Sequence, residues 1–496
     1  SPVPGQVHPP PRGRVKKRHE KGMIPWYIVV DGLQRKEAFP MDMIAHLVTG
    51  FLENLCSSLT TDTLADFGAR MQQIFQASCE LLTQIIPSIL NKMDDTIAED
   101  PKRMKDWKIL RIDERTLVTA FGELRFKRRY YQHRITGETA YLLDKELGLP
   151  AHVKVSGDVR HAAVVAAESS SYKKSADIAS VTGISKMSVC NYVKDLDNFP
   201  KLKPEGEKRS VKLLYVEADE DHVSLQDGRS VQKKLVYIHE GVRNVGKRRE
   251  LVNPRYLTWP LEGTSEELWV AVSDYIEQQY MAEDIEHIFL SGDGASWIRT
   301  GEEWLYPCVP ILDSFHSMKA LRSLFAESPE RISEFLSHVR TDRRTHAVAL
   351  CQKTLKETPE RHRKGKLDKA KYLLNNWVRI RNQRHPGALG CSAEGHVSHI
   401  LSARLSSRPH GWSQQNMENM AELRVMKANG QIIDYAQLRR SNSTREGVES
   451  SAEVKEVIGT KELRKSLRKA SKTWLKNAQA SIPILTAGKT SPLYQA

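Results

Sequence analysis

The sequence has few of the features that are typical of secreted and membrane proteins, which argues against both classes. Its six cysteines are scattered, without a Cys-x-x-Cys pair, so we expect neither a disulfide framework nor a structural zinc site. No apolar run approaches the ~20 residues that span a bilayer, and no signal peptide is visible. These absences favour a cytoplasmic protein with reduced thiols and no membrane partner. The first residue is Ser rather than Met, so the natural chain is expected to begin upstream.

Acidic residues are also in deficit. The chain has 75 Lys and Arg residues against 61 Asp and Glu residues, which gives a formal net charge of +14. A basic excess of this size favours a polyanionic partner. At 496 residues the chain is long enough for about two to four domains, each with a core of its own.

The first 150 residues divide into three regions of different composition. Residues 1–24 are rich in Pro, Arg and Lys, which predicts a disordered basic arm. Residues 25–105 are expected to be helical, because apolar residues recur at helical spacing through most of this region. In residues 106–150 the pattern changes to period two around Phe121-Gly122, which predicts a β-hairpin with a basic and aromatic face. Such a face either carries DNA backbone or is an ordinary solvated strand face.

Residues 151–200 have the spacing of a helix-turn-helix. A short helix is expected from about Ser175, Gly183 breaks it, and Ser185 caps a second helix. This spacing lets two helices cross closely around a tight turn, as DNA-binding helix-turn-helix units do. The second helix would then offer five side chains to a DNA groove: Lys186, Met187, Ser188, Asn191 and Lys194. The alternative is a helical hairpin that serves packing alone.

The remaining sequence predicts an α/β core that is interrupted and followed by basic helices. Strands are expected at 211–218, 231–239, 255–259, 286–291 and 308–312, with helices at 264–280 and 295–305. Three consecutive strands followed by helix–strand alternation are typical of a mixed sheet covered by helices. The expected divisions are the first part of the core at 205–314, a basic helical insertion at 315–385, the closing part of the core at 386–430 and a basic helical tail at 431–496.

Three acidic positions in this core suggest metal-ion chemistry. Asp219 ends the first predicted strand, Asp293 follows the fourth, and Glu394 begins a helix that reaches back over the sheet. Hard cations such as Mg²⁺ take oxygen ligands, and two ions about 3.5–4 Å apart support phosphodiester chemistry. Glu217, Asp219 and Asp221 alternate along one strand face, so Asp221 is an alternative first ligand. Each carboxylate is otherwise a solvated surface group.

Other residues near these positions also have two interpretations. Asp313 and His316 would add a hydrogen bond behind the metal ligands or contact DNA, whereas His316 is equally well a structural histidine. Arg404 and Arg408 lie a few helical turns beyond the glutamate, where they would hold phosphates or be solvated. Two tryptophans are expected to anchor the core rather than stack on bases: Trp297 and Trp412.

In their order along the chain, these motifs resemble a known family. The motifs are the helix-turn-helix, Val216-Glu217-Ala218-Asp219, Ser291-Gly292-Asp293-Gly294-Ala295-Ser296-Trp297-Ile298, Leu312-Asp313-Ser314-Phe315-His316, and Ala393-Glu394-Gly395-His396-Val397 with Arg404 and Ser407-Arg408-Pro409-His410-Gly411-Trp412-Ser413. Together they resemble the Lre-type insertion-sequence transposases of bacteria, which are related to the Mutator-like DDE transposases. The resemblance covers roughly residues 105–490.

The resemblance implies a ribonuclease H-like core with an all-helical insertion between the second aspartate and the glutamate. It matches Asp219, Asp293 and Glu394 to the catalytic triad, and Asp313 with His316 to an Asp-x-x-His element. Related enzymes often have Asp-Gly at the first position, whereas Asp219 is followed by Glu220, so Asp221 stays open as first ligand.

The expected function is therefore that of a metal-dependent DNA transposase, a polynucleotidyl transferase. It would use two Mg²⁺ or Mn²⁺ ions and bind double-stranded DNA, both at the terminal repeats of its element and at the target. A homodimer or larger assembly on DNA is expected because two ends must be cut together, in a nucleoid-associated bacterial setting. The alternatives are a nuclease or resolvase on the same core, and an inactive DNA-binding regulator.

Overall fold

The structure is a computed structural model, and it describes residues 41–60, 67–246, 248–408 and 411–439. The chain divides into two compact units, Ser1–Thr116 with Leu124–Ala151 and Leu117–Glu123 with His152–Ala496. The expected basic arm, and the expected basic tail from 440 onward, lie outside the described residues. No helix within the described ranges is long and apolar enough to cross a membrane.

The first unit joins two long helices to a small sheet in the order β1-β2-β3. Its elements are α1 (Met41–Thr60), α2 (Phe67–Glu99), α3 (Pro101–Asp106), β1 (Trp107–Thr119), β2 (Gly122–His133), β3 (Thr139–Tyr141) and α4 (Leu142–Glu146), except that the hairpin tip Leu117–Glu123 belongs to the second unit. Asp100 begins α3 by accepting a hydrogen bond from the Lys102 amide at 3.0 Å, as an N-cap does. The predicted hairpin is present, and its strands are longer than the period-two pattern indicated.

Part of the basic charge on this hairpin is neutralised inside the first unit. Arg129 donates to Asp94 of α2 at 2.7 Å. Arg115 donates to the buried Asp144 at 2.6 Å, and Arg128 pairs with the same carboxylate. These arginines hold the strands to α2 and α4, so packing accounts for them without a DNA partner.

The second unit begins with three helices, α5 (Gly157–Ser169), α6 (Tyr172–Ala179) and α7 (Lys186–Lys194). Gly183 adopts a φ of 70°, the left-handed conformation that glycine tolerates, and this makes the turn between α6 and α7. Ser185 then caps α7 by accepting from the Ser188 amide at 3.0 Å. Both helices therefore form where the cap and breaker residues predict them, and α6 begins three residues earlier than expected.

A five-stranded mixed sheet forms the centre of the second unit, in the order β10-β9-β4-β5-β8. Its strands are β4 (Leu213–Ser224), β5 (Ser230–His239), β8 (Arg255–Thr258), β9 (His287–Gly292) and β10 (Cys308–Leu312). β5 is antiparallel to both β4 and β8, whereas β9 is parallel to β4 and to β10. The predicted mixed α/β architecture is thus confirmed. A short hairpin of β6 (Val242–Val245) and β7 (Arg248–Leu251) was not predicted.

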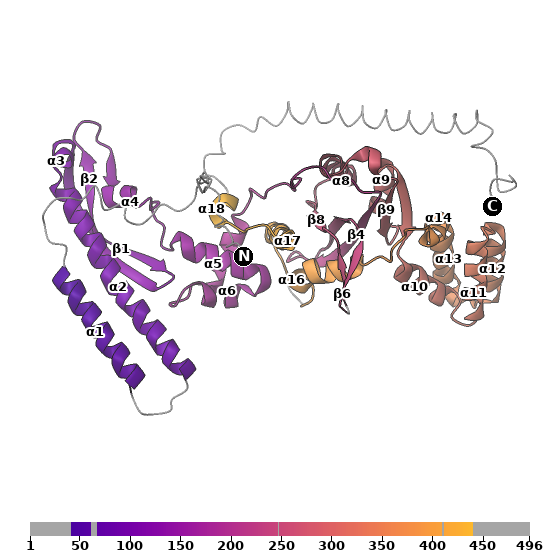
Figure 1. The fold of residues 1–496 in the computed structure, drawn as a ribbon, viewed down its shortest axis with the longest axis horizontal. Coiled ribbons are helices and arrows are strands. Elements are labelled where there is room, and N and C mark those ends of the chain that lie inside the picture. Colours follow the sequence, from indigo (N-terminus) through magenta and orange to yellow (C-terminus); the bar gives the residue numbers. More distant parts are fainter. Residues whose placement is uncertain (1–40, 61–66, 247, 409–410, 440–496) are drawn as a thin grey trace, which may run out of the picture. The chain divides into compact units, whose positions relative to one another are not determined.

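Successive side chains of β4 point to opposite faces of the sheet, and one of these faces packs into an apolar core. Leu214, Val216 and Ala218 pack under α8 (Ser265–Gln279) and α9 (Ser296–Trp304), with Trp269 fully buried among them. Figure 1 shows these two helices on one side of the strands and the α16 region on the other. Because each fully buried large side chain contributes about 1.5–3 kcal/mol, this face fixes the register of β4. The other face is left for the polar residues of the site.

The predicted basic insertion at 315–385 is helical. It contains α10 (Ser314–Leu324), α11 (Glu330–Arg340), α12 (Arg344–Glu357), α13 (Glu360–Asn375), α14 (Trp377–Arg381) and the short η2 (Asn382–Arg384). These helices enclose a core of their own around Phe335, Leu373 and Trp377, and Leu312 at the end of β10 packs into it. The insertion is therefore attached at the edge of the sheet where β10 ends.

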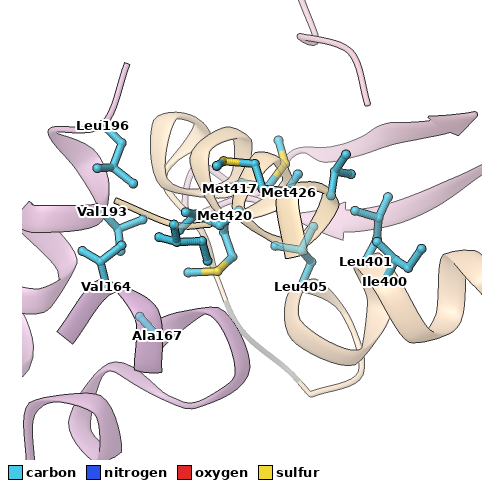
Figure 2. Packing of buried hydrophobic residues seen from close by; sticks show 14 of the residues in the cluster. Val164, Ala167, Val193, Leu196, Ile400, Leu401, Leu405, Met417, Met420 and Met426 are labelled. Carbon is cyan, nitrogen blue, oxygen red and sulfur yellow. The ribbon is translucent and has the colours of Figure 1, made fainter. Parts of the chain in front are cut away.

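The last described segment returns to the α5–α7 helices. It consists of α15 (Ala393–Val397), the π-helical η3 (Ser398–Ser402), α16 (Ala403–Leu405), α17 (Gln414–Ala428) and α18 (Tyr435–Leu438). Figure 2 shows Val164 and Val193, from the α5–α7 side, facing Met417 and Met420 of α17 across one apolar cluster. Asn419 strengthens this junction by donating to the Val193 carbonyl at 2.8 Å. The α5–α7 region and the chain end thus share one core.

Candidate active site

Three parallel strands each deliver one aspartate to the same edge of the sheet. Glu217 of β4 lies opposite Ser291 of β9, and Ser291 lies opposite Ile311 of β10. Two residues further along the chain from each of these, Asp219 lies within β4, and Asp293 and Asp313 lie just past the ends of β9 and β10, so the register continued by two residues puts them in one row. Since adjacent strands are about 4.8 Å apart, the row brings three carboxylates to one edge. The Asp313 amide donates to the Gly292 carbonyl at 2.7 Å, which continues the ladder to this point.

Asp219 lies within this row, but it does not end its strand as the sequence suggested. β4 runs on to Ser224, because its pairing with β5 continues to the Ser224–Ser230 pair. Its pairing with β9 stops at Glu217 and Ser291. At Asp219, β4 is still paired with β5 but no longer with β9. The edge of β4 that faced β9 is therefore open at this residue, although the strand continues.

The surroundings of Asp219 disfavour its charge. The pKa of Asp219 is raised to about 6, mainly by burial and also by the nearby Glu220 and Asp293 carboxylates, while the Glu220 amide and His316 lower it. Glu220 itself points to the other face, where it accepts a 2.6 Å hydrogen bond from the Trp297 indole. Asp219 and Asp293 are thus close enough to repel each other, as expected of two carboxylates that face one shared site.

Asp221, the alternative first ligand, is engaged elsewhere. Its Oδ1 accepts hydrogen bonds from the Ser402 and Ser406 hydroxyls, at 2.8 and 2.7 Å. Burial raises its pKa, and these two hydroxyls lower it. Its Oδ2 is buried without a hydrogen-bond partner in the described part of the chain. Asp221 therefore fastens β4 to the η3–α16 segment, which leaves Asp219 as the aspartate that faces Asp293.

We expect Asp219→Asn and Asp221→Ala to change stability in opposite directions. The raised pKa of Asp219 means that its charge opposes folding, so the wild-type chain loses stability as pH rises from about 4 to about 6. Asp219→Asn should therefore be more stable by about 1–3 kcal/mol above pH 6 and nearly unchanged at pH 4. Asp221→Ala should be less stable by about 1–3 kcal/mol, because it leaves two hydroxyls without their acceptor.

Urea unfolding of both variants, with a chelator present and at several pH values, measures these differences. A gain for Asp219→Asn that is equally large at pH 4 and pH 7.5 would contradict the electrostatic explanation. A neutral Asp221→Ala would show that the serine contacts do not hold the segment.

Asp293 is held in a tight turn that excludes larger neighbours. A Cβ on Gly292 would lie 2.7 Å from the Ala218 carbonyl oxygen, and Gly294 adopts a φ of 85°. The Asp293 carboxylate accepts from the Ala295 amide at 2.8 Å, and its carbonyl accepts from the Tyr372 hydroxyl of α13 at 2.6 Å. The helical insertion therefore contacts the backbone of the turn that carries Asp293.

Asp313 and Glu394 complete the acidic edge. Asp313 caps α10 by accepting from the Phe315 amide at 3.1 Å, and His316 Nε2 lies 3.9 Å from its Oδ2. Burial raises the pKa of Asp313, and the nearby Glu394 and Glu217 raise it further. Glu394 is exposed on α15, which packs against β4. The helix predicted to begin at Glu394 is present, and it continues through the π-helical turn η3 to Leu405.

The donor chemistry of this edge suits a hard divalent cation, but the side chains are not gathered around one point. In the described part of the chain, no three His, Cys, Asp or Glu side chains form a group placed to hold a metal ion. Carboxylate oxygens are nevertheless the ligands that Mg²⁺ prefers, and Asp219 and Asp293 gain from a cation that offsets their repulsion. The residue types of this edge therefore fit such an ion.

Arg404 has a different environment from the one that its spacing suggested. Its guanidinium lies 5.3 Å from the Tyr172 ring and 4.8 Å from the Trp412 ring, and its Nε donates to the Ala167 carbonyl at 3.0 Å. Stacking between two aromatic rings and a carbonyl bond account for its charge without a phosphate. Arg408 is exposed. Both predicted core tryptophans are buried: Trp297 and Trp412.

The candidate DNA-contact residues of α7 lie mostly on its outer side. Lys186, Met187, Asn191 and Lys194 are exposed, whereas the inward Val189 and Val193 are fully buried. Ser188 is partly buried, and its hydroxyl is 2.9 Å from the Ser185 hydroxyl, so it takes part in the cap of α7. The outer side of α7 therefore carries two lysines without an ion pair in the described part of the chain.

Comparison with known proteins identifies relatives over most of the length. Residues 61–442 match the profile of the Uncharacterised protein family (UPF0236). A UPF0236 protein of Caldanaerobacter subterraneus subsp. tengcongensis, whose name joins eleven locus designations, is 33% identical over 425 residues, or 85% of this chain and 89% of the relative. A second from that organism is 33% identical over 413 residues, or 83% and 86%. A UPF0236 protein of Streptococcus gallolyticus is 27% identical over 397 residues, or 76% and 85%.

Proposed function

The chain belongs to the uncharacterised protein family UPF0236, and we propose that it is a metal-dependent DNA transposase of the DDE type. The observation that carries this proposal is the row of aspartates on neighbouring parallel strands, with the Glu394 helix packed against the same sheet. Asp219, Asp293 and Glu394 are the proposed catalytic residues. Asp313 and His316 would support them from the neighbouring strand end.

The sheet topology supports a ribonuclease H-like core for this site. Three antiparallel strands, β8, β5 and β4, are followed by β9 and β10, which run parallel to β4. The all-helical insertion between Asp293 and Glu394 agrees with the arrangement that the resemblance to Lre-type transposases implies. The fold would serve to bring carboxylates that are distant in sequence to one edge.

In this proposal Asp219, Asp293 and Glu394 would hold two Mg²⁺ or Mn²⁺ ions. When bound, such ions activate the attacking oxygen and stabilise the leaving oxygen of a phosphodiester. The chain itself fixes the Asp293 turn: a Cβ on Gly292 or Gly294 would meet the Ala218 carbonyl oxygen or the Asn376 side chain, so glycine is needed on both sides of Asp293. Terminal-repeat DNA would be recognised through the α6–α7 helix-turn-helix, with α7 in the groove.

The helical insertion offers a second surface for the DNA backbone. Exposed basic side chains lie along α13: Arg361, Arg363, Lys364, Lys369 and Lys371. The same helix carries Tyr372, which bonds to the Asp293 carbonyl. A basic helix that also touches the site would hold phosphates near it, and such contacts give affinity without sequence choice.

A relative's gene organisation supports a mobile element. The name of the first Caldanaerobacter relative joins eleven locus designations. A gene that copies itself within a genome would produce repeated loci of this kind, which the regulator alternative does not require. For this chain we therefore favour the transposase over the regulator.

A strand-transfer assay tests the proposal. The full chain is incubated with Mg²⁺, with a DNA duplex that carries a pre-cut terminal repeat, and with a plasmid target. A transposase joins the 3′ end to the plasmid, most efficiently when two ends are present, because two copies act together. Cleavage of uncut ends without joining would instead identify a nuclease or resolvase. Binding without cleavage or joining would identify a regulator and overturn the proposal.

A further inference from the structure

Glu217 is a buried carboxylate at the centre of a polar network below the acidic edge. It is 3% exposed, on the same face of β4 as Asp219 and two residues before it. One oxygen accepts from the Tyr237 hydroxyl at 2.5 Å, and the other lies 3.1 Å from His239 Nε2. Removing a carboxylate from water costs free energy. Hydrogen bonds to both of its oxygens must offset this cost in the folded protein.

The network reaches across to the segment that carries Glu394. The Ser392 amide donates to the same Glu217 oxygen at 2.6 Å, and the Ser392 hydroxyl lies 3.2 Å from it. The Tyr237 hydroxyl is 2.8 Å from the Ser392 hydroxyl. Glu217 thus binds the chain immediately before α15, by a backbone group that any residue except proline would offer at that position.

α15 depends on such contacts for its position. It is the first part of a helical segment that continues into η3 and α16, and the amides of a first turn have no partner within the helix, so they need contacts from outside it. One turn after Ser392, the His396 ring lies 4.6 Å from the Tyr237 ring, and its Nδ1 is 3.0 Å from the Tyr256 hydroxyl. Tyr237 therefore contacts the helix at both ends, and Glu217 anchors its first turn.

We infer that Glu217 is a positioning residue, which sets the place of Glu394 relative to Asp219 by holding Ser392. Asp219 lies two residues beyond Glu217 on one chain, and Glu394 lies two residues beyond Ser392 on the other. The Glu217–Ser392 contact therefore joins the two segments just before the residues that must converge. Its catalytic consequence rests on the proposed function, whereas the contact itself does not.

A carboxylate suits this position better than an amide. The donors that meet at Glu217 come from tyrosine, histidine and the serine backbone, and an ionised carboxylate only accepts. Glutamine would turn one acceptor into an NH₂ donor among these donors, with nearly the same shape.

Hydrogen–deuterium exchange of the full chain without metal tests the contact directly. In Glu217→Gln, amides of residues 392–397 should exchange about tenfold faster or more, while those of β9 stay unchanged. Glu240→Gln is the control, because Glu240 is a partly buried carboxylate that also accepts from a tyrosine, Tyr280, and lies away from residues 392–397 in sequence. If Glu217→Gln does not fold, Ser392→Ala removes the hydroxyl contacts with Glu217 and Tyr237 but keeps the amide bond, and it should accelerate exchange in the same segment by a smaller factor. Unchanged exchange at 392–397 in the folded variant overturns the inference.

A double-mutant cycle on cleavage of a terminal repeat tests the consequence. Glu217→Gln should slow cleavage by about 10- to 100-fold, because small displacements of reacting groups cost that much. In a chain that already carries Glu394→Gln, it should add almost nothing to the remaining rate, since it acts through Glu394. Full additivity overturns the positioning role. A wild-type chain that does not cleave, together with faster exchange at 392–397, leaves the contact established and rejects the proposed function.

Discussion

Replacing Asp293 with Asn should reduce cleavage of a terminal repeat by at least about 10³-fold, which corresponds to roughly 4 kcal/mol of transition-state stabilisation. The reason is that Asp293 lies between Asp219 and Asp313 in the row of carboxylates, in a turn that admits little movement. Asparagine preserves the 2.8 Å bond to the Ala295 amide through its own oxygen, so the turn should survive. What is lost is a negative charge at the shared edge.

Binding of the same terminal repeat should change by less than about twofold in Asp293→Asn, because α7 is unchanged. Band-shift titration and a cleavage time course on the same preparation measure the two effects together. Asp227→Asn is a suitable control, since Asp227 is a solvent-exposed carboxylate that pairs with Arg229 in the β4–β5 turn. Cleavage at the wild-type rate by Asp293→Asn would exclude this row of carboxylates as the active site.

The sequence predicted the elements of this fold well where one local pattern determines each of them. The strands of the sheet follow short apolar runs, as in Leu213–Val216 and Ile288–Leu290. α7 begins where Ser185 supplies a cap, and Gly183 supplies the turn before it. Patterns of this kind depend on residues within a few positions of each other, so they are readable without a structure.

The end of β4 could not be predicted in the same way. Its second half is polar, with Asp219, Glu220, Asp221 and His222 in sequence, and an isolated reading ends the strand there. The strand continues because β5 supplies a hydrogen-bonding partner as far as Ser224. Here the pairing between strands determines the length of β4 more than its local composition does. For this reason Asp219 can lie within the strand and still face the site.

The supporting residues of the site were harder still to predict. Glu217 and Ser392 are 175 residues apart, and Tyr372 and Asp293 are 79 residues apart. Arg404 is stacked on Tyr172, which lies in a different helical region. No local pattern marks such pairs, because each contact exists only once the sheet, the insertion and the chain end have packed. The aspartate row was more accessible, since apolar strands followed by acidic residues mark a sheet edge.

Reversing the charge of both exposed lysines of α7, Lys186→Glu with Lys194→Glu, should weaken terminal-repeat binding by about 10²- to 10³-fold near physiological salt. Both lysines lie on the outer side of α7, while the inner side packs on α17 through Val189 and Val193. The substitutions should therefore leave the fold intact, with a change in stability below about 0.5 kcal/mol. Loss of binding would then report on the surface alone.

The salt dependence of binding shows whether these lysines neutralise phosphates. If each contacts one phosphate, the slope of log K against log salt should fall by about 1.8 in the double variant, because each lost contact removes about 0.9. Lys208→Glu with Lys212→Glu is the matched control, since it reverses the same number of exposed charges in the segment leading into β4. An equal loss of affinity in the control would mean that net charge, rather than α7, governs binding. An unchanged affinity in the α7 variant would assign these helices to packing alone.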